Sequence, residues 1–189
     1  MYRTRPLSKP ERWILWGIPA LFIIGGGWHF LFDFVPFLPV ALIAPANDSV
    51  WEHMKMGLIP VIGWWLIYFF VKQRSHNFDV DAWFTAALVS LVVTLTAMPL
   101  IFYFYRGAFG VQPSTTFALY FDMFILLLSN TFGQLLGLYF YRRSISIKAI
   151  FAFLPMLLIV GVFVFFTFFP PDFPFFYDFL NEHFGIYGR

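Results

Sequence analysis

Long apolar runs alternate with short polar segments along the chain, and five of the runs are long enough to cross a lipid bilayer as helices. A helix needs about 20 predominantly apolar residues to span a hydrocarbon layer ~30 Å thick. The runs of that length are 13–34, 50–71, 82–105, 116–141 and 147–169. The pattern therefore predicts an all-α fold, a polytopic membrane bundle with five transmembrane helices, formed by residues 1–189 as a single domain.

The composition supports a membrane protein and excludes several functions. Of the 189 residues, 60% are hydrophobic and only 12% are charged, whereas an ordinary soluble domain has about 25% charged residues. The chain has no cysteine, so disulfides, thiolate metal ligands and cysteine nucleophiles are excluded, and a metal would need His, Asp or Glu ligands. The net charge is +2, with the basic residues in short scattered groups, so we expect no binding to nucleic acid.

Basic residues concentrate in alternate connecting segments, which indicates how the helices are oriented. Nine Lys and Arg lie before the first run and after the second and fourth, whereas only Arg106 and Arg189 lie in the opposite segments. Because cytoplasmic loops are enriched in Lys and Arg, we expect a cytoplasmic amino terminus and an external carboxyl terminus. The proline-broken segment 35–46 and the aromatic tail 170–189 then lie at the outer face. The first run is longer than the 7–15-residue core of a signal peptide, so we expect a retained helix.

Ionisable side chains inside the apolar runs are the candidate functional residues, because a charge near the bilayer centre costs at least about 2.5 kcal/mol. Five of them lie toward the outer ends of their runs: His29, Asp33, Glu52, His53 and Asp122. His29 and Asp33 are four residues apart and would share one helix face. We expect all five to converge on a polar pocket that opens to the outer side.

Imidazole and carboxylate groups without sulfur suit Zn²⁺, Mn²⁺ or Fe²⁺. We therefore expect His29, Asp33, His53 and Asp122 to be metal ligands, with zinc as one possible metal. In an enzyme, the metal would lower the pKa of a bound water, and Glu52 and Asp122 would be the catalytic carboxylates that move its proton.

Each polar group also has a structural alternative. Ser49 and Glu52 fit the S-x-x-E capping box that begins a helix. The two histidines could be hydrogen-bonded without binding a ligand, and Asp122 could pair with Arg106 or Lys55. Ser129, Gly133 and Gly137 recur at every fourth position, a small-residue stripe typical of close helix packing.

Residues 47–55, NDSVWEHMK, resemble the Asn-Glu-Ser-Val-Trp-Glu-His-x-Lys block of a family of small bacterial integral membrane proteins that is classed as a domain of unknown function. The likeness extends to GGWHFLFD, YFDMFI and FTFFPPDFPFFYD, so it covers most of the chain. Asp48 stands where the family has Glu. The resemblance implies a multi-pass protein of the bacterial cytoplasmic membrane and no particular activity. It also implies a shared set of positions, namely His29, Asp33, Asn47, Trp51, Glu52, His53 and Asp122.

Three classes of function stay open. The first is an outward-facing pocket that binds a divalent metal or a small cationic ligand, in its enzymatic form a metal-dependent membrane hydrolase acting on a lipid or an envelope component. The second is a proton- or cation-coupled transporter, which with five spans would require an oligomer. The third is a structural or partner subunit whose charges only pair among themselves. The bilayer is the expected partner in all three, and whether the protein is an enzyme stays open.

Overall fold

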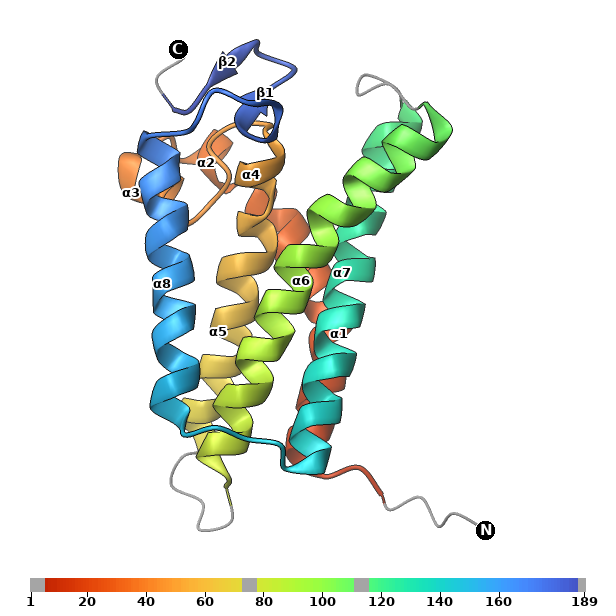
Figure 1. Cartoon of the computed structure of the whole chain (residues 1–189), viewed down its shortest axis with the longest axis vertical. Coiled ribbons are helices and arrows are strands. Elements are labelled where there is room, and N and C mark those ends of the chain that lie inside the picture. The colour runs from red at the N-terminus through yellow and green to blue at the C-terminus, as the bar shows by residue number, and fades with distance from the viewer. Residues whose placement is uncertain (1–5, 73–77, 111–115, 187–189) are drawn as a thin grey trace.

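A computed structural model of the chain describes residues 6–72, 78–110 and 116–186. Long helices stand side by side (Figure 1). They are α1 (Lys9–His29), α5 (Lys55–Lys72), α6 (Val80–Phe109), α7 (Thr116–Arg143) and α8 (Ala149–Phe168). Short elements join or follow them: α2 (Leu31–Phe34), α3 (Leu38–Ala41), α4 (Val50–His53), the 3₁₀ turn η1 (Pro174–Phe176), β1 (Tyr177–Asp178) and β2 (His183–Phe184).

The expected helical fold is confirmed, and within the described residues four helices are long and apolar enough to cross a membrane. These are Val50–Lys72, Val80–Phe109, Tyr120–Arg143 and Ala149–Phe168, which correspond to the second to fifth predicted runs. The first predicted run, 13–34, divides into α1 and α2. At 21 residues α1 is about 31 Å long, but its charged first turn and its three consecutive glycines make it less apolar than the other four.

Close approach of α7 to α6 forms the centre of the bundle. A Cβ atom on Gly137 would lie 2.9 Å from the carbonyl oxygen of Ala86, and one on Gly133 would lie 2.6 Å from that of Ser90. Such distances are far below van der Waals contact, so only glycine permits this helix separation. The predicted small-residue stripe therefore packs against α6. On its other side α7 contacts α1, and α8 packs on α6.

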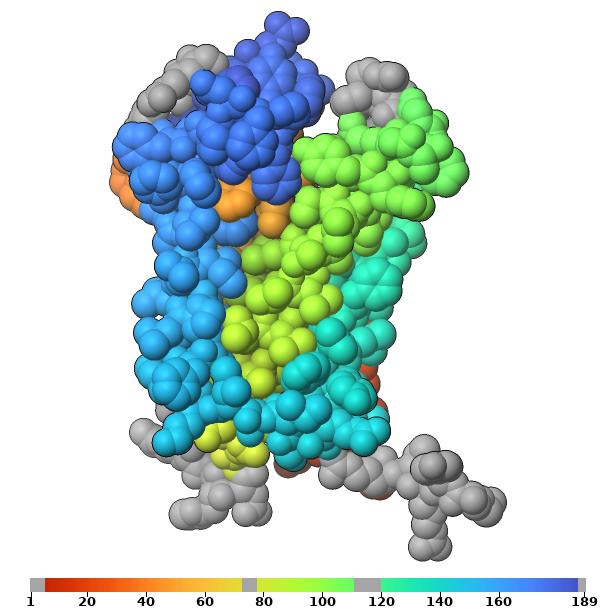
Figure 2. Space-filling view, in the orientation of Figure 1, coloured from red at the N-terminus to blue at the C-terminus, as the bar shows by residue number. Residues whose placement is uncertain are grey.

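The short elements gather at one end of the bundle, opposite the start of α1 (Figure 1). There α2, α3 and α4 lie beneath the carboxyl-terminal segment, whereas the adjoining ends of α6 and α7 stand to one side of it (Figure 1 and Figure 2). An aromatic stack holds the segment in place. The Trp51 ring on α4 lies 4.1 Å from the Phe163 ring on α8 and 4.9 Å from the Phe176 ring in η1. We refer to residues 177–184, which contain β1 and β2, as the C-terminal hairpin.

Candidate metal site beneath the C-terminal hairpin

The loop that enters α4 is shaped by hydrogen bonds from its own polar side chains. The Asn47 side-chain oxygen accepts from the backbone N–H of Ser49 (3.0 Å), and the Ser49 hydroxyl accepts from the backbone N–H of Glu52 (3.2 Å). Ser49 is thus the N-cap of α4, as one half of the predicted capping box requires. The Glu52 carboxylate does not complete the box, because it accepts instead from the backbone N–H of Ala46 (2.8 Å). These contacts fix the positions of Asp48 and His53.

His29, Asp48 and His53 come together at this end of the bundle, where each offers one ligand atom within 4.8 Å of the others. His29 is the last residue of α1, Asp48 lies in the loop before α4, and His53 is the last residue of α4. The two imidazole rings stack with their centroids 4.9 Å apart. The Nε2 atom of His53 lies 3.7 Å from the Asp48 carboxylate. The expected convergence of His29 and His53 is therefore present, with Asp48 as the third member.

The two rings differ in their hydrogen bonds. The Nδ1 atom of His53 lies 2.9 Å from the Ser49 carbonyl oxygen, so Nδ1 carries a proton and donates it, and Nε2 is the ring atom that faces Asp48. A histidine that binds a metal commonly donates its other N–H to a carbonyl in this way. Among the described residues, the buried Nδ1 atom of His29 has no hydrogen-bond partner. An unsatisfied buried polar atom costs about 1–3 kcal/mol, which a bound ligand would offset.

The spacing of the cluster can be compared with that of a bound ion. Tetrahedral Zn²⁺ with bonds of 2.0–2.1 Å places its ligand atoms about 3.3 Å apart, whereas these atoms are up to 4.8 Å apart. Side-chain rotations that move the ligand atoms toward one another by about an ångström or more would close that difference. Two imidazoles and one carboxylate are a donor set that suits Zn²⁺, Mn²⁺ or Fe²⁺, and three protein ligands leave a coordination position open.

A pocket of about 160 Å³ adjoins the cluster. Its lining is His29, Asp33, Pro45, Ala46, Asn47, Asp48, Asp178, Asn181 and His183. The lining contains both members of the predicted His29–Asp33 pair, although Asp33 is exposed and belongs to α2 rather than to a continuous first helix.

Asp122, the fifth residue expected in the pocket, lies elsewhere. Its carboxylate accepts hydrogen bonds from Arg106 Nη2 (2.9 Å) and from the Tyr105 hydroxyl (2.6 Å). Asp122 is on α7 and faces α6, whose carboxyl-terminal half extends with α7 away from α4 and the C-terminal hairpin (Figure 1). The structure thus corrects the expected grouping: Asp122 pairs with Arg106, which the sequence left open as an alternative, and it does not lie with the histidines.

Glu52 is likewise committed to another partner. It is 3% exposed, and Lys55 is fully buried beside it. The Lys55 ammonium donates to the Glu52 carboxylate (2.6 Å), to the carbonyl oxygen of Ala41 (2.6 Å) and to the Thr167 hydroxyl (2.7 Å). All three of its N–H groups are satisfied. Glu52 is therefore a positioning residue that ties α4 to α3 and α8 through Lys55 and Thr167, rather than a free carboxylate.

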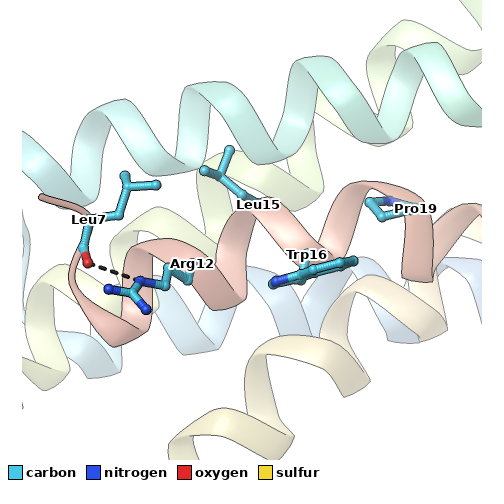
Figure 3. A pocket seen from close by; sticks show the side chains of 5 residues that line it. All are labelled: Leu7, Arg12, Leu15, Trp16 and Pro19. Carbon is cyan, nitrogen blue, oxygen red and sulfur yellow. Dashed lines mark hydrogen bonds between the residues drawn. The ribbon is translucent and has the colours of Figure 1, made fainter.

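A larger hollow of about 310 Å³ lies on the other half of α1 (Figure 3). It is lined by Leu7, Arg12, Leu15, Trp16 and Pro19. Arg12 is its single charged residue and donates from Nε to the carbonyl oxygen of Leu7 (3.1 Å). Among the described lining residues there is no His, Asp or Glu, and a guanidinium does not bind cations, so this hollow offers no metal ligand.

The sequence reasoning missed Asp48 and three residues of the C-terminal hairpin, Asp178, Asn181 and His183. It ranked ionisable groups by their depth in the apolar runs, and these four lie in loops or at the chain end. One signal for Asp48 was available in the sequence, since it supplies a carboxylate five residues before His53 in the polar segment NDSVWEH.

Comparison with known proteins identifies a family. No curated protein and no solved structure matches the chain. A protein-family model does match the chain, from residue 2 to residue 186. The match covers nearly the whole chain, including every residue of the cluster and of the pocket. The protein accordingly belongs to the family of unknown function DUF6512.

Proposed function

We propose that this protein is a five-span membrane protein of the bacterial cytoplasmic membrane whose external pocket binds a divalent cation through His29, Asp48 and His53. The observation that carries the proposal is the placement of their ligand atoms within 4.8 Å of one another by two segments, the end of α1 and the loop that leads into α4 together with α4 itself. The unpartnered Nδ1 of His29 and the oriented ring of His53 support it independently.

Topology supports an external location of the pocket. Alongside the four apolar helices, α1 is long enough to span the bilayer and packs against α5 and α7. Lys72 ends α5 and Arg143 ends α7, both at the end of the bundle away from the cluster. Because basic residues mark the cytoplasmic side, the cluster lies on the external side.

Charge and geometry define what the site would do. A divalent cation with one carboxylate and two neutral imidazoles has a net charge of +1 and an open position, which suits water or an anionic group. In the enzymatic form, a metal-bound water loses a proton near neutral pH. Asp33, which lines the pocket and is exposed, is the carboxylate able to accept that proton, since Glu52 is held by Lys55.

Metal binding by the purified protein in detergent tests the proposal. Titration calorimetry with Zn²⁺ and with Mn²⁺ should detect one ion per chain for at least one metal. His29→Ala, His53→Ala and Asp48→Asn should each weaken its binding about 100-fold or more, because each removes a ligand. Asp122→Asn is the matched control and should leave the affinity unchanged. Equal affinity in the three ligand variants and in the wild type would refute the site.

Cation transport is a second candidate, favoured by polar groups inside the bundle. Asn130 and Gln134 on α7 are fully buried. Among the described residues, neither side-chain polar atom of Asn130 has a hydrogen-bond partner, and the Gln134 side-chain oxygen also lacks one. Together they could extend a polar path from the pocket into the membrane. Uptake of Mn²⁺ into vesicles that is abolished by Asn130→Leu would support transport, whereas binding without uptake would exclude it.

A further inference from the structure

The C-terminal hairpin is fastened directly to the loop that carries Asp48. The buried Asp178 carboxylate accepts the backbone N–H of Asp48 (3.1 Å), and the Asn47 side chain donates to the carbonyl oxygen of Gly185 (3.2 Å). Burial raises the pKa of the Asp178 carboxyl, but hydrogen bonds from Asn181, Asp48 and Leu180 outweigh it and hold the pKa below its ordinary value. At neutral pH Asp178 is therefore a charged carboxylate, and in this form it holds the hairpin against the Asp48 loop.

The strand register directs a third histidine toward the same pocket. Asp178 pairs with His183 across the two antiparallel strands, and residues directly opposite each other place their side chains on one face. Since the Asp178 side chain contacts the Asp48 loop, the His183 side chain lies on the face that covers the site. His183 lines the pocket. Its buried Nδ1 atom has no hydrogen-bond partner within the part of the chain that the structure describes.

We propose that His183 contacts the group bound at the open position of the cation, and that this group is a small oxyanion of the phosphate type. The inference rests on the proposed cation site. His183 lines the pocket but is not one of the three clustered residues, so in this proposal it lies across the pocket from the ion rather than on it.

The cation and the hydrogen-bond donors of the pocket favour an anion of this size, and the two other carboxylates that line it, Asp33 and Asp178, are compensated by solvent and by hydrogen bonds respectively. The cation with its three ligands has a net charge of +1, and the Asp178 carboxylate is saturated by four hydrogen bonds from Asp48, Leu180 and Asn181. Asp33 is exposed and therefore solvated. A phosphate oxygen on the cation would leave other oxygens to accept from the His183 imidazole and from the Asn181 amide, both of which line the pocket of about 160 Å³.

The experiment measures two affinities on the full-length protein in detergent: that for the metal alone, and that of the metal-loaded protein for inorganic phosphate. A hydrogen bond to a charged group corresponds to about 10- to 100-fold in affinity. His183→Ala should weaken phosphate binding by that factor while it changes the metal affinity by less than about threefold. His183→Gln, which keeps a hydrogen-bonding group, should recover part of the loss. Glu182→Gln, at the exposed neighbouring position, is the control and should match the wild type in both affinities.

The outcomes separate this inference from the proposed function. If the wild type binds no metal, the proposed function fails. If metal binds but phosphate does not, or if His183→Ala binds phosphate as the wild type does, only the inference is overturned. An equal loss of metal and phosphate in a folded His183→Ala protein would make His183 a direct ligand and would overturn its placement across the pocket.

Discussion

Replacing Lys55 by methionine tests the buried ion pair with Glu52 that supports the proposed metal site. The substitution keeps an unbranched apolar side chain of similar length and removes only the ammonium group. It leaves the Glu52 carboxylate, 3% exposed, without its counter-charge, and it removes the donor that lies 2.6 Å from the Ala41 carbonyl oxygen. The Thr167 hydroxyl loses its contact with the ammonium as well.

The expected effect is large because the pair is buried. Removing one partner of a buried ion pair costs about 3–5 kcal/mol. For a protein of this size, 1 kcal/mol corresponds to about 2–4 °C in Tm, so Lys55→Met should lower Tm by roughly 6–20 °C. The double variant Lys55→Met/Glu52→Gln removes both charges and keeps an oxygen for the N–H of Ala46. It should recover most of the lost stability.

Thermal unfolding of the purified protein in detergent, followed by circular dichroism, measures these shifts. The metal affinity of Lys55→Met should fall at the same time, because the ion pair positions both the loop that carries Asp48 and the helix that carries His53. A Tm of Lys55→Met within 2 °C of the wild type would refute the reasoning. So would a double variant that melts as low as the single one, because the loss would then come from packing rather than from an unpaired charge.

Three further substitutions probe other contacts. Asp122→Asn should lower Tm by less than about 4 °C, because its pair with Arg106 is partly exposed and such pairs contribute at most about 1 kcal/mol; a larger fall in the same melting assay would contradict this. Gly133→Ala should destabilise the protein by about 1–3 kcal/mol, because the new Cβ would lie 2.6 Å from the Ser90 carbonyl oxygen. Gly161→Ala, which meets no atom within 4 Å, is the matched control and should not lower Tm. Asp178 has a lowered pKa, so its contribution to hairpin docking is complete above the unfolded pKa of about 3.9 and is lost as pH falls through the folded value. Hydrogen exchange of residues 177–184 should show protection that decreases over that acidic range, and Asp178→Asn should remove this pH dependence.

The helices were predictable from run length, but their ends were not. Apolar runs report how much chain can cross a bilayer, and the second to fifth runs correspond to helices. The prediction of one continuous helix over the first run was wrong, because hydropathy does not indicate where a backbone helix is interrupted. The chain leaves α1 after His29, two residues beyond the Gly25–Gly27 triplet, and Asp33 lies on the separate turn α2.

The site was predictable only in part. His29 and His53 were expected to meet because both lie at the outer ends of their runs, and they do meet. Depth along a run does not tell which neighbour a side chain faces, and Arg106 on the adjacent helix takes Asp122. The role of His183 depends on a contact between segments about 130 residues apart, between Asp48 and Asp178, which no spacing rule in a single sequence reveals.

This distant contact has a consequence for how the protein is made. The ribosome synthesises Asp48 before Asp178, the hairpin residue that contacts it and that lies 130 residues later in the chain. Contacts between remote parts of a chain also form slowly. Until the hairpin has been translated and docked, the three residues of the proposed site, His29, Asp48 and His53, lie open on that side, so we expect stable binding of an ion only after docking.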